Sequence, residues 1–306
     1  MRKRLLVVLL FFFVAAISGS AQTKSVAERL GYPADAKLLI IHGDDLAVAH
    51  SVDSASFDAL DRGAVTSASI MVPCPWLTEV AEYAKAHPEA DLGLHLVLNS
   101  EWKSYRWGPV ESKDKVPSLL DPAGTLWSNS EQVAKNVKPE EAEREIRAQV
   151  KHALAMGIHP THLDTHMGSL MVNPQLIAAY AKVAHENHLP FLFMKIPGMG
   201  PEVLSALNDK DVVLDSIAIA NPSVNPAEWE QFYLETIGNL KPGLTELIVH
   251  LGQDDSELKA IMGGLPYGSE WRQRDFNAVT SPEFKKALQD NHVILVKWKD
   301  LQKLVQ

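Results

Sequence analysis

The sequence is poor in the groups that make disulfides and thiolate metal sites. It contains one cysteine, Cys74, among 306 residues. A single cysteine excludes a disulfide within the chain and any zinc cluster built from several thiolates. Cys74 lies between two prolines with no histidine beside it in the sequence, which favours a small buried residue over a nucleophile. Chemistry at a metal or catalytic site must therefore come from histidine and carboxylate side chains, and the chain has 12 histidines.

An excess of positive charge is also absent. The 29 Lys and Arg residues are outnumbered by 38 Asp and Glu residues, and the net charge is −9. This balance excludes general attraction to nucleic acid or to anionic lipid. The hydrophobic share of 46% and the charged share of 22% are ordinary for a globular protein, so disordered, collagen-like and coiled-coil classes are excluded as well.

Long apolar runs are absent except at the N-terminus. Arg2, Lys3 and Arg4 precede an apolar run over residues 5–17, and small residues follow up to Ala21. This order is typical of a secretory signal peptide, and the run is shorter than the ~20 residues that span a bilayer. We therefore predict a signal peptide over 1–21, a lead-in segment over 22–36, and an exported protein of the periplasm or the extracellular space without stable membrane insertion.

The rest of the chain alternates between strand and helix patterns without a break in composition. Strands are predicted over 37–41, 66–72, 92–98, 161–166, 191–194, 212–217, 246–250 and 293–298, and helices over 52–60, 76–86, 139–156, 174–186, 226–240 and 282–289. Such alternation favours a parallel α/β fold in a single domain over 37–306. Eight units of this kind close into a β/α barrel, and an open doubly wound sheet is the alternative.

A long polar and aromatic segment over 99–138 interrupts the alternation. It is too long for a plain connection and is predicted to be a functional loop. It carries Trp102, Tyr105, Trp107 and Trp127, whose rings are of the kind that stack on sugars. The same rings are equally suited to anchoring the loop on the barrel, and the sequence leaves both interpretations open.

Acidic and imidazole side chains gather at the predicted strand ends, where the loops of a parallel α/β fold converge. Asp44 and Asp45 follow the first strand, His95 and His166 belong to the third and fourth, and His250 ends the seventh. One carboxylate and two imidazoles, Asp45 with His95 and His166, would make a three-ligand site with open positions for water and substrate. Asp44, expected to point away from Asp45, could accept a proton from the water, and His250 could donate one to a leaving group.

Two alternatives apply to these histidines. His162 and His166 flank Asp164 in a pattern that favours one shared strand face, so either histidine could be the ligand and Asp164 could orient one of them. A lone histidine on an apolar strand, such as His95, is more often a hydrogen-bonded core residue than a ligand, and only its convergence with the other groups favours a metal site.

Four linked motifs carry a resemblance to a known family. They are Asp44-Asp45 after the first strand, R-G-x-V-T-S over 62–67, G-L-H-L over 93–96, and P-T-H-L-D-T-H over 160–166. In order and spacing along most of the mature chain they resemble the YdjC/ChbG family of carbohydrate deacetylases. The family's first motif usually continues with Phe-Gly, where this chain has Leu46-Ala47. The residue after His166 also departs from the family's pattern, since Met167 stands where a histidine-rich run normally continues.

The resemblance implies an irregular TIM-type barrel like that of the polysaccharide deacetylases, and removal of acetyl groups from N-acetylated sugars with one divalent metal ion, Mg²⁺ or Zn²⁺. It implies Asp45, His95 and His166 as ligands, Asp44 as base and His250 as acid. The substrate is then an N-acetylated sugar or oligosaccharide.

A late motif, W-R-Q-R-D-F over 271–276, also resembles the family and implies support of the site by Arg272 and Asp275. Two other classes of function remain open on the same residues. One is metal-dependent hydrolysis of a phosphoester or glycosidic bond, and the other is an exported sugar-binding protein without catalysis.

Overall fold

The structure is a computed structural model that describes residues 24–195 and 198–306. The predicted signal peptide lies outside the described residues. The predicted lead-in forms a short helix, α1 (Val26–Arg29), whose capping box is made by Ser25 and Glu28. Within the described parts of the chain, no helix is both long and apolar enough to cross a membrane.

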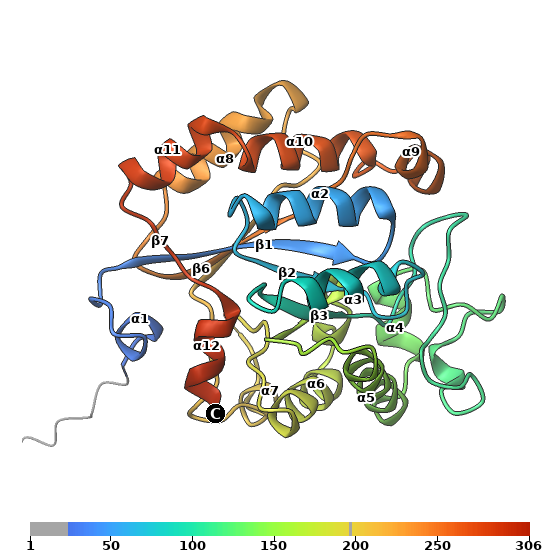
Figure 1. Cartoon of the computed structure of the whole chain (residues 1–306). Helices are drawn as coiled ribbons and strands as arrows, with labels where there is room; N and C mark the ends of the chain where they lie inside the picture. The colour runs from blue at the N-terminus through green and yellow to red at the C-terminus, as the bar shows by residue number, and fades with distance from the viewer. Residues whose placement is uncertain (1–23, 196–197) are drawn as a thin grey trace, which may run out of the picture.

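A parallel sheet of seven strands runs through the middle of the molecule, with helices packed around it (Figure 1). The strands are β1 (Lys37–Leu46), β2 (Ser67–Ile70), β3 (Leu92–Leu96), β4 (Leu163–Thr165), β5 (Ser216–Ile219), β6 (Gly243–Val249) and β7 (Ile294–Leu295). They are ordered β4-β3-β2-β1-β6-β5, and β7 pairs with the first half of β1. The predicted single β/α-barrel-like domain is thus confirmed in architecture, and the doubly wound alternative is not adopted.

The helices include every one predicted from the sequence. They are α2 (His50–Asp61), α3 (Leu77–Ala86), α4 (Ser130–Asn136), α5 (Pro139–Ala155), α6 (Pro174–Glu186), α7 (Pro201–Leu204), α8 (Trp229–Gly238), α9 (Ser256–Met262), α10 (Ser269–Val279), α11 (Pro282–Asp290) and α12 (Trp298–Val305), with short 3₁₀ turns η1 (Pro117–Leu119), η2 (His166–Met171) and η3 (Pro226–Glu228). In Figure 1, α8, α10 and α11 lie on one side of the strands and α5, α6 and α7 on the other.

The predicted fifth strand does not form. Over 191–194 the chain makes only isolated bridges, Phe191 with Leu163 of β4 and Met194 with Leu214 ahead of β5. It passes from one neighbour to the other within four residues, so no ladder develops on either side. The barrel is therefore closed irregularly between β4 and β5. The last predicted strand is also shorter than expected, because Trp298 begins α12.

The side chains of β1 alternate between two environments, as the period of a strand requires. Leu39 and Ile41 pack in the core beneath α8, α10 and α11, whereas Leu38 and Ile40 pack in a separate core that includes Trp298. The same alternation turns His42 and Asp44 toward the interior of the barrel, where the polar residues of the neighbouring strands also lie.

Candidate active site

Two consecutive carboxylates reach the same pocket because β1 bulges at its end. Gly43 pairs with Ala68 and Leu46 pairs with Ile70, so β1 has one residue more than β2 over this stretch. Asp45 takes a left-handed backbone conformation with φ 73°. The expectation that Asp44 and Asp45 point in opposite directions is therefore wrong, since both side chains line one cavity.

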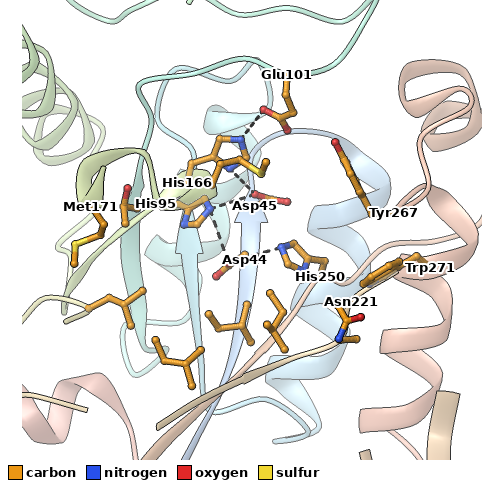
Figure 2. A pocket seen from close by; sticks show the side chains of 18 of the residues that line it. Asp44, Asp45, His95, Glu101, His166, Met171, Asn221, His250, Tyr267 and Trp271 are labelled. Atoms are coloured by element: carbon orange, nitrogen blue, oxygen red, sulfur yellow. Dashed lines mark hydrogen bonds and ion pairs between the residues drawn. The ribbon is translucent and has the colours of Figure 1, made fainter. Parts of the chain in front are cut away.

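Asp45, His95 and His166 come together as expected (Figure 2). Asp45 Oδ1 lies 3.4 Å from His95 Nε2 and 3.3 Å from His166 Nδ1. This oxygen is buried and has no hydrogen-bond partner among the described residues. A buried carboxylate oxygen facing two imidazole nitrogens is costly without a cation among them. The donor set of one carboxylate and two imidazoles thus fits a divalent ion.

Asp44 lies between this cluster and His250. Its Oδ2 is 3.8 Å from His95 Nε2 and 3.9 Å from His250 Nε2, and its Oδ1 is 3.2 Å from His42 Nε2. His250 follows the end of β6 and its side chain is 26% exposed, while that of Asp44 is 9% exposed. The carboxylate and the imidazole therefore face each other across a space open to solvent.

Asp164 contacts His95 rather than either histidine of its own strand. His95 and Asp164 are paired neighbours on β3 and β4, and Asp164 Oδ1 lies 2.7 Å from His95 Nδ1. That contact leaves His95 Nε2 directed at Asp45. The sequence had associated Asp164 with His162 or His166 instead.

His162 and His166 both turn inward but at different depths. His166 lies at the pocket beside Asp45, whereas His162 is wholly buried and stacks on Trp298 at a ring distance of 5.0 Å. The His162 ring also covers Gly93, where an added Cβ would come within 2.3 Å of the imidazole. The geometry favours His166 over His162 as the ligand.

Glu101 and His42 belong to the site although sequence reasoning assigned them no role. Glu101 Oε2 lies 2.9 Å from His166 Nε2 and so orients that ring from the long loop. His42 Nε2 lies 3.0 Å from Asp164 Oδ2 and connects that carboxylate with Asp44. The even spacing of His42 and Asp44 on one strand was the available signal for His42, but Glu101 had none.

Arg272 and Asp275 on α10 support the site in two ways. Arg272 Nη2 lies 2.6 Å from Asp45 Oδ2, on the side away from the histidines. Asp275 is buried and accepts hydrogen bonds from the backbone N–H of His250 at 2.9 Å and from Tyr233 at 2.6 Å. It therefore holds the backbone at His250 and does not touch the imidazole.

The loop tryptophans lie behind the site. Trp102 and Trp107 are 1% and 4% exposed and neither lines the pocket. Trp107 packs against His166 with ring centres 6.0 Å apart, and the Arg272 guanidinium lies 5.8 Å from the Trp102 ring. Their burial favours the interpretation in which aromatic rings anchor the loop.

The charges of the cluster depend on its buried ion pairs. Burial favours the neutral form of Asp45, but Arg272 and His166 outweigh it and hold the pKa of this carboxyl well below its usual range. Burial lowers the pKa of His166, yet Glu101 and Asp45 together raise it to about 10. Without a cation, His166 would therefore be protonated between Glu101 and Asp45, while Arg272 pairs with the other oxygen of Asp45.

The pocket has a volume of about 610 Å³. It is lined by Asp44, Asp45, His95, Glu101, Thr165, His166, Met167, Gly168, Met171, Leu192, Phe193, Met194, Ile217, Ile219, Ala220, Asn221, Pro222, Ile248, His250, Tyr267, Trp271 and Arg272. Every residue proposed for metal binding or proton transfer is thus at one cavity.

Comparisons with known proteins find relatives that match most of this chain. A carbohydrate deacetylase of Thermus thermophilus is 32% identical over 273 residues, covering 87% of this chain and 94% of the relative. A carbohydrate deacetylase of Brevibacillus brevis is 26% identical and covers 86% of this chain and 99% of its own. A chitooligosaccharide deacetylase of Yersinia enterocolitica is 31% identical over half of this chain and 58% of its own length.

One solved structure has the same fold over almost its whole length. It is an Enterococcus faecalis protein, described as a candidate cellobiose-phosphate cleavage protein, with a TM-score of 0.72 at 24% identity. The match covers 87% of this chain and 99% of the other. The sequence model of the family described as YdjC-like protein matches residues 38–290, which is most of the chain. This chain therefore belongs to the YdjC-like family.

Proposed function

We propose that this protein is a metal-dependent hydrolase that removes acetyl groups from N-acetylated carbohydrate. The placement of Asp44 between the Asp45–His95–His166 cluster and His250 is the observation that carries the proposal. A binding protein has no use for a carboxylate and an imidazole facing each other beside a metal site. The relatives described as carbohydrate deacetylases support the same chemistry.

Asp45, His95 and His166 would hold the ion, with Asp164 and Glu101 orienting the two imidazoles. A divalent ion bound there supplies Lewis-acid activation of a carbonyl and of water. Arg272 occupies the second oxygen of Asp45 and leaves the first one free to face the histidines. The ligand set suits Zn²⁺ well, and Mg²⁺ is the other candidate.

The proton transfers belong to Asp44 and His250. Asp44 takes a proton from the attacking water while the oxygen of that water bonds to the acetyl carbon. The carbon–nitrogen bond then breaks, and His250 gives a proton to the nitrogen, which otherwise leaves poorly. The products are acetate and a free amino sugar. His42, which contacts Asp44 Oδ1, fixes the orientation of that carboxylate.

Acetate release tests the proposal. The protein is stripped of metal and assayed on N-acetylated and O-acetylated saccharides, with zinc, magnesium, cobalt or nickel restored. We expect metal-dependent release of acetate from an N-acetylated member of the panel. Release of phosphate from p-nitrophenyl phosphate, with no acetate from any saccharide, would contradict the proposal and favour a phosphoester hydrolase. Metal binding without turnover of any substrate would favour a binding protein.

The proposal includes export of the protein from the cytoplasm. The basic start, the apolar run over 5–17 and the small residues up to Ala21 support it. Mass spectrometry of the protein recovered outside the cytoplasm should find Gln22 as the first residue. Recovery only of the full-length chain from the cytoplasm would contradict export.

A further inference from the structure

One buried carboxylate of the barrel interior has no part in the chemistry described so far. Glu246 lies on β6, and its side chain is 1% exposed. It shares a strand face with Ile248, which lines the pocket, so Glu246 lies one layer beneath the pocket floor. An ionised carboxylate at such a depth is costly unless charged or hydrogen-bonding groups surround it. Packing alone would favour an apolar side chain at this position.

Glu246 is held against the imidazole of His42. Its Oε1 accepts a hydrogen bond from Trp298 Nε1 at 2.9 Å and lies 3.7 Å from His42 Nδ1. The second distance is too long for a hydrogen bond but is an ion-pair distance in a dry interior. Trp298 is wholly buried and stacks on His162, so its indole N–H is fixed and keeps the carboxylate in place.

The other ring nitrogen of His42 also faces carboxylates. His42 Nε2 lies 3.0 Å from Asp164 Oδ2, 3.2 Å from Asp44 Oδ1 and 3.0 Å from Ser69 Oγ. Carboxylates thus face both sides of the ring, two at Nε2 and Glu246 at Nδ1. An ionised carboxylate accepts but does not donate, so both ring nitrogens need a proton. This environment therefore favours the imidazolium form of His42.

The pKa shifts of the pair agree with this charge. Burial lowers the pKa of His42, but Asp164, Asp44 and Glu246 outweigh burial and hold that pKa well above its usual value. Burial raises the pKa of Glu246 to about 7, against the opposing effects of His42 and Trp298. Above that pH the carboxylate and the imidazolium are both charged, and the positive ring lies between Glu246 and Asp44.

We propose that Glu246 is a positioning residue for the reaction and acts on Asp44 through His42. It keeps a proton on His42 Nδ1, and the charged ring holds Asp44 Oδ1 in an ion pair. Asp44 Oδ2 is then left to face His250, whose Nε2 lies 3.9 Å away. This inference rests on the proposed function. Glu246 itself lies outside the pocket lining and does not touch the reacting atoms.

The first test compares two substitutions of Glu246 in the metal-loaded enzyme at about pH 8, where its carboxyl is ionised. Glu246→Gln keeps the size of the side chain and an oxygen for Trp298 but removes the charge. We expect kcat for acetate release to fall about 10- to 100-fold, with KM and metal content unchanged. Glu246→Asp keeps the charge and should retain more activity than Glu246→Gln. A purely structural role predicts the opposite order, because glutamine has the shape of glutamate.

Asp91 provides a matched control. It is 1% exposed and lies 3.7 Å from His162 Nδ1, so it forms another buried carboxylate–histidine pair at the same distance. Neither Asp91 nor His162 lines the pocket. Asp91→Asn should lower Tm and leave kcat unchanged. An equal loss of kcat in Asp91→Asn and Glu246→Gln would overturn the proposal, because loss of any buried carboxylate would then have the same effect.

A second measurement does not depend on turnover. NMR of the zinc-loaded protein with ¹⁵N-labelled histidine reports the protons on each ring, and His42→Asn identifies the signals of His42. We expect two protonated ring nitrogens in the wild type and one in Glu246→Gln. A neutral His42 in the wild type, or an unchanged imidazolium in Glu246→Gln, would overturn the proposal.

A double-mutant cycle tests whether Glu246 acts through His42. In the His42→Asn background, Glu246→Gln should not lower kcat further, whereas a full additional loss would overturn the proposal. No acetate from the wild type with any metal would overturn the proposed function and with it the role of Glu246 in the reaction. The ring-nitrogen spectra distinguish that outcome from failure of the Glu246–His42 pairing itself.

Discussion

At the scale of single residues, the adjacent Asp44 and Asp45 have different contacts, and these contacts suit them to different roles. Asp45 is tied to Arg272 through one oxygen and faces two histidines with the other. Asp44 has no arginine partner in the part of the chain that the structure describes, and it faces His42 and His250. The sequence showed two adjacent carboxylates after a strand, but only the bulge and the contacts explain how both enter one pocket.

Replacing Asp44 tests its role as a base. Asp44→Asn should lower kcat by about 10²–10⁴-fold, the usual contribution of a general base, with little change in bound metal. The amide keeps the shape of the side chain but cannot accept the proton. Turnover at saturating substrate and metal content by elemental analysis check this together. A rate near that of the wild type would remove Asp44 from the mechanism.

The two histidines of the fourth strand form a matched pair for testing the ligand set. His166→Ala should lower metal stoichiometry well below one per chain, because it removes a nitrogen that faces Asp45 Oδ1. His162→Ala should leave the stoichiometry unchanged and lower Tm, since it empties a buried site beside Trp298. Elemental analysis and thermal unfolding read the two effects. Loss of metal from the His162 variant alone would reverse the assignment.

At the scale of elements, the end of β1 stores backbone strain next to the site. Ala47 has φ 74°, a left-handed conformation that glycine adopts more easily than alanine. This explains physically why glycine is usual at this position in the family that the sequence resembles. The backbone N–H of Ala47 donates to Asp53 Oδ1 at 2.6 Å, and this contact helps to hold the turn. The backbone strain therefore comes from having alanine at position 47, and a glycine there would adopt the same turn without it.

Relief of this strain gives a prediction for stability. Ala47→Gly should raise the free energy of unfolding by ~1 kcal/mol. The substitution removes the energy cost of a left-handed alanine, and this gain exceeds the extra chain entropy that a glycine loses on folding. The same change at a helical position, Ala55→Gly in α2, should instead destabilise by at least ~1 kcal/mol. Denaturant unfolding of both variants measures the difference. A destabilised Ala47→Gly would show that the turn is not strained.

Element prediction succeeded where the pattern was local. Pro174 and Pro282 at helix starts predicted α6 and α11 from nearby residues alone. It failed over 191–194, because an apolar run of strand type cannot show whether a neighbouring strand is aligned to pair with it. The four-residue α7 and the 3₁₀ turn η2 likewise depend on contacts rather than on periodicity.

At the scale of the whole molecule, buried carboxylates connect the site with stability. Burial favours the neutral forms of Asp45 and Asp164. Arg272 together with His166 outweighs burial at Asp45, and His95 together with His42 outweighs it at Asp164, so the pKa values of both carboxyls are lowered. A carboxyl whose folded pKa is lowered stabilises the fold fully above its unfolded pKa, near 3.8. That stabilisation is lost as the pH falls toward the folded value.

We therefore expect the Tm of the metal-free protein to fall steeply below about pH 4. Asp164→Asn should have a lower Tm at neutral pH and a shallower decline in acid, because it removes one of the two carboxyls. Thermal unfolding from pH 7 to pH 2.5 in the presence of a chelator measures both profiles. Parallel profiles for the variant and the wild type would show that Asp164 does not contribute to acid unfolding.

The sequence by itself determined the α/β alternation, the single domain, and the residue types at the strand ends. These follow from local periodicity and from the geometry of parallel strands, and they predicted Asp44, Asp45, His95, His166 and His250. Only the tertiary structure decided that His166 rather than His162 faces Asp45 and that Asp164 orients His95. It alone decided that Glu101 joins the site and that the pocket is largely aliphatic. Those outcomes depend on how strands and loops far apart in the chain pack together, and no local pattern records that packing.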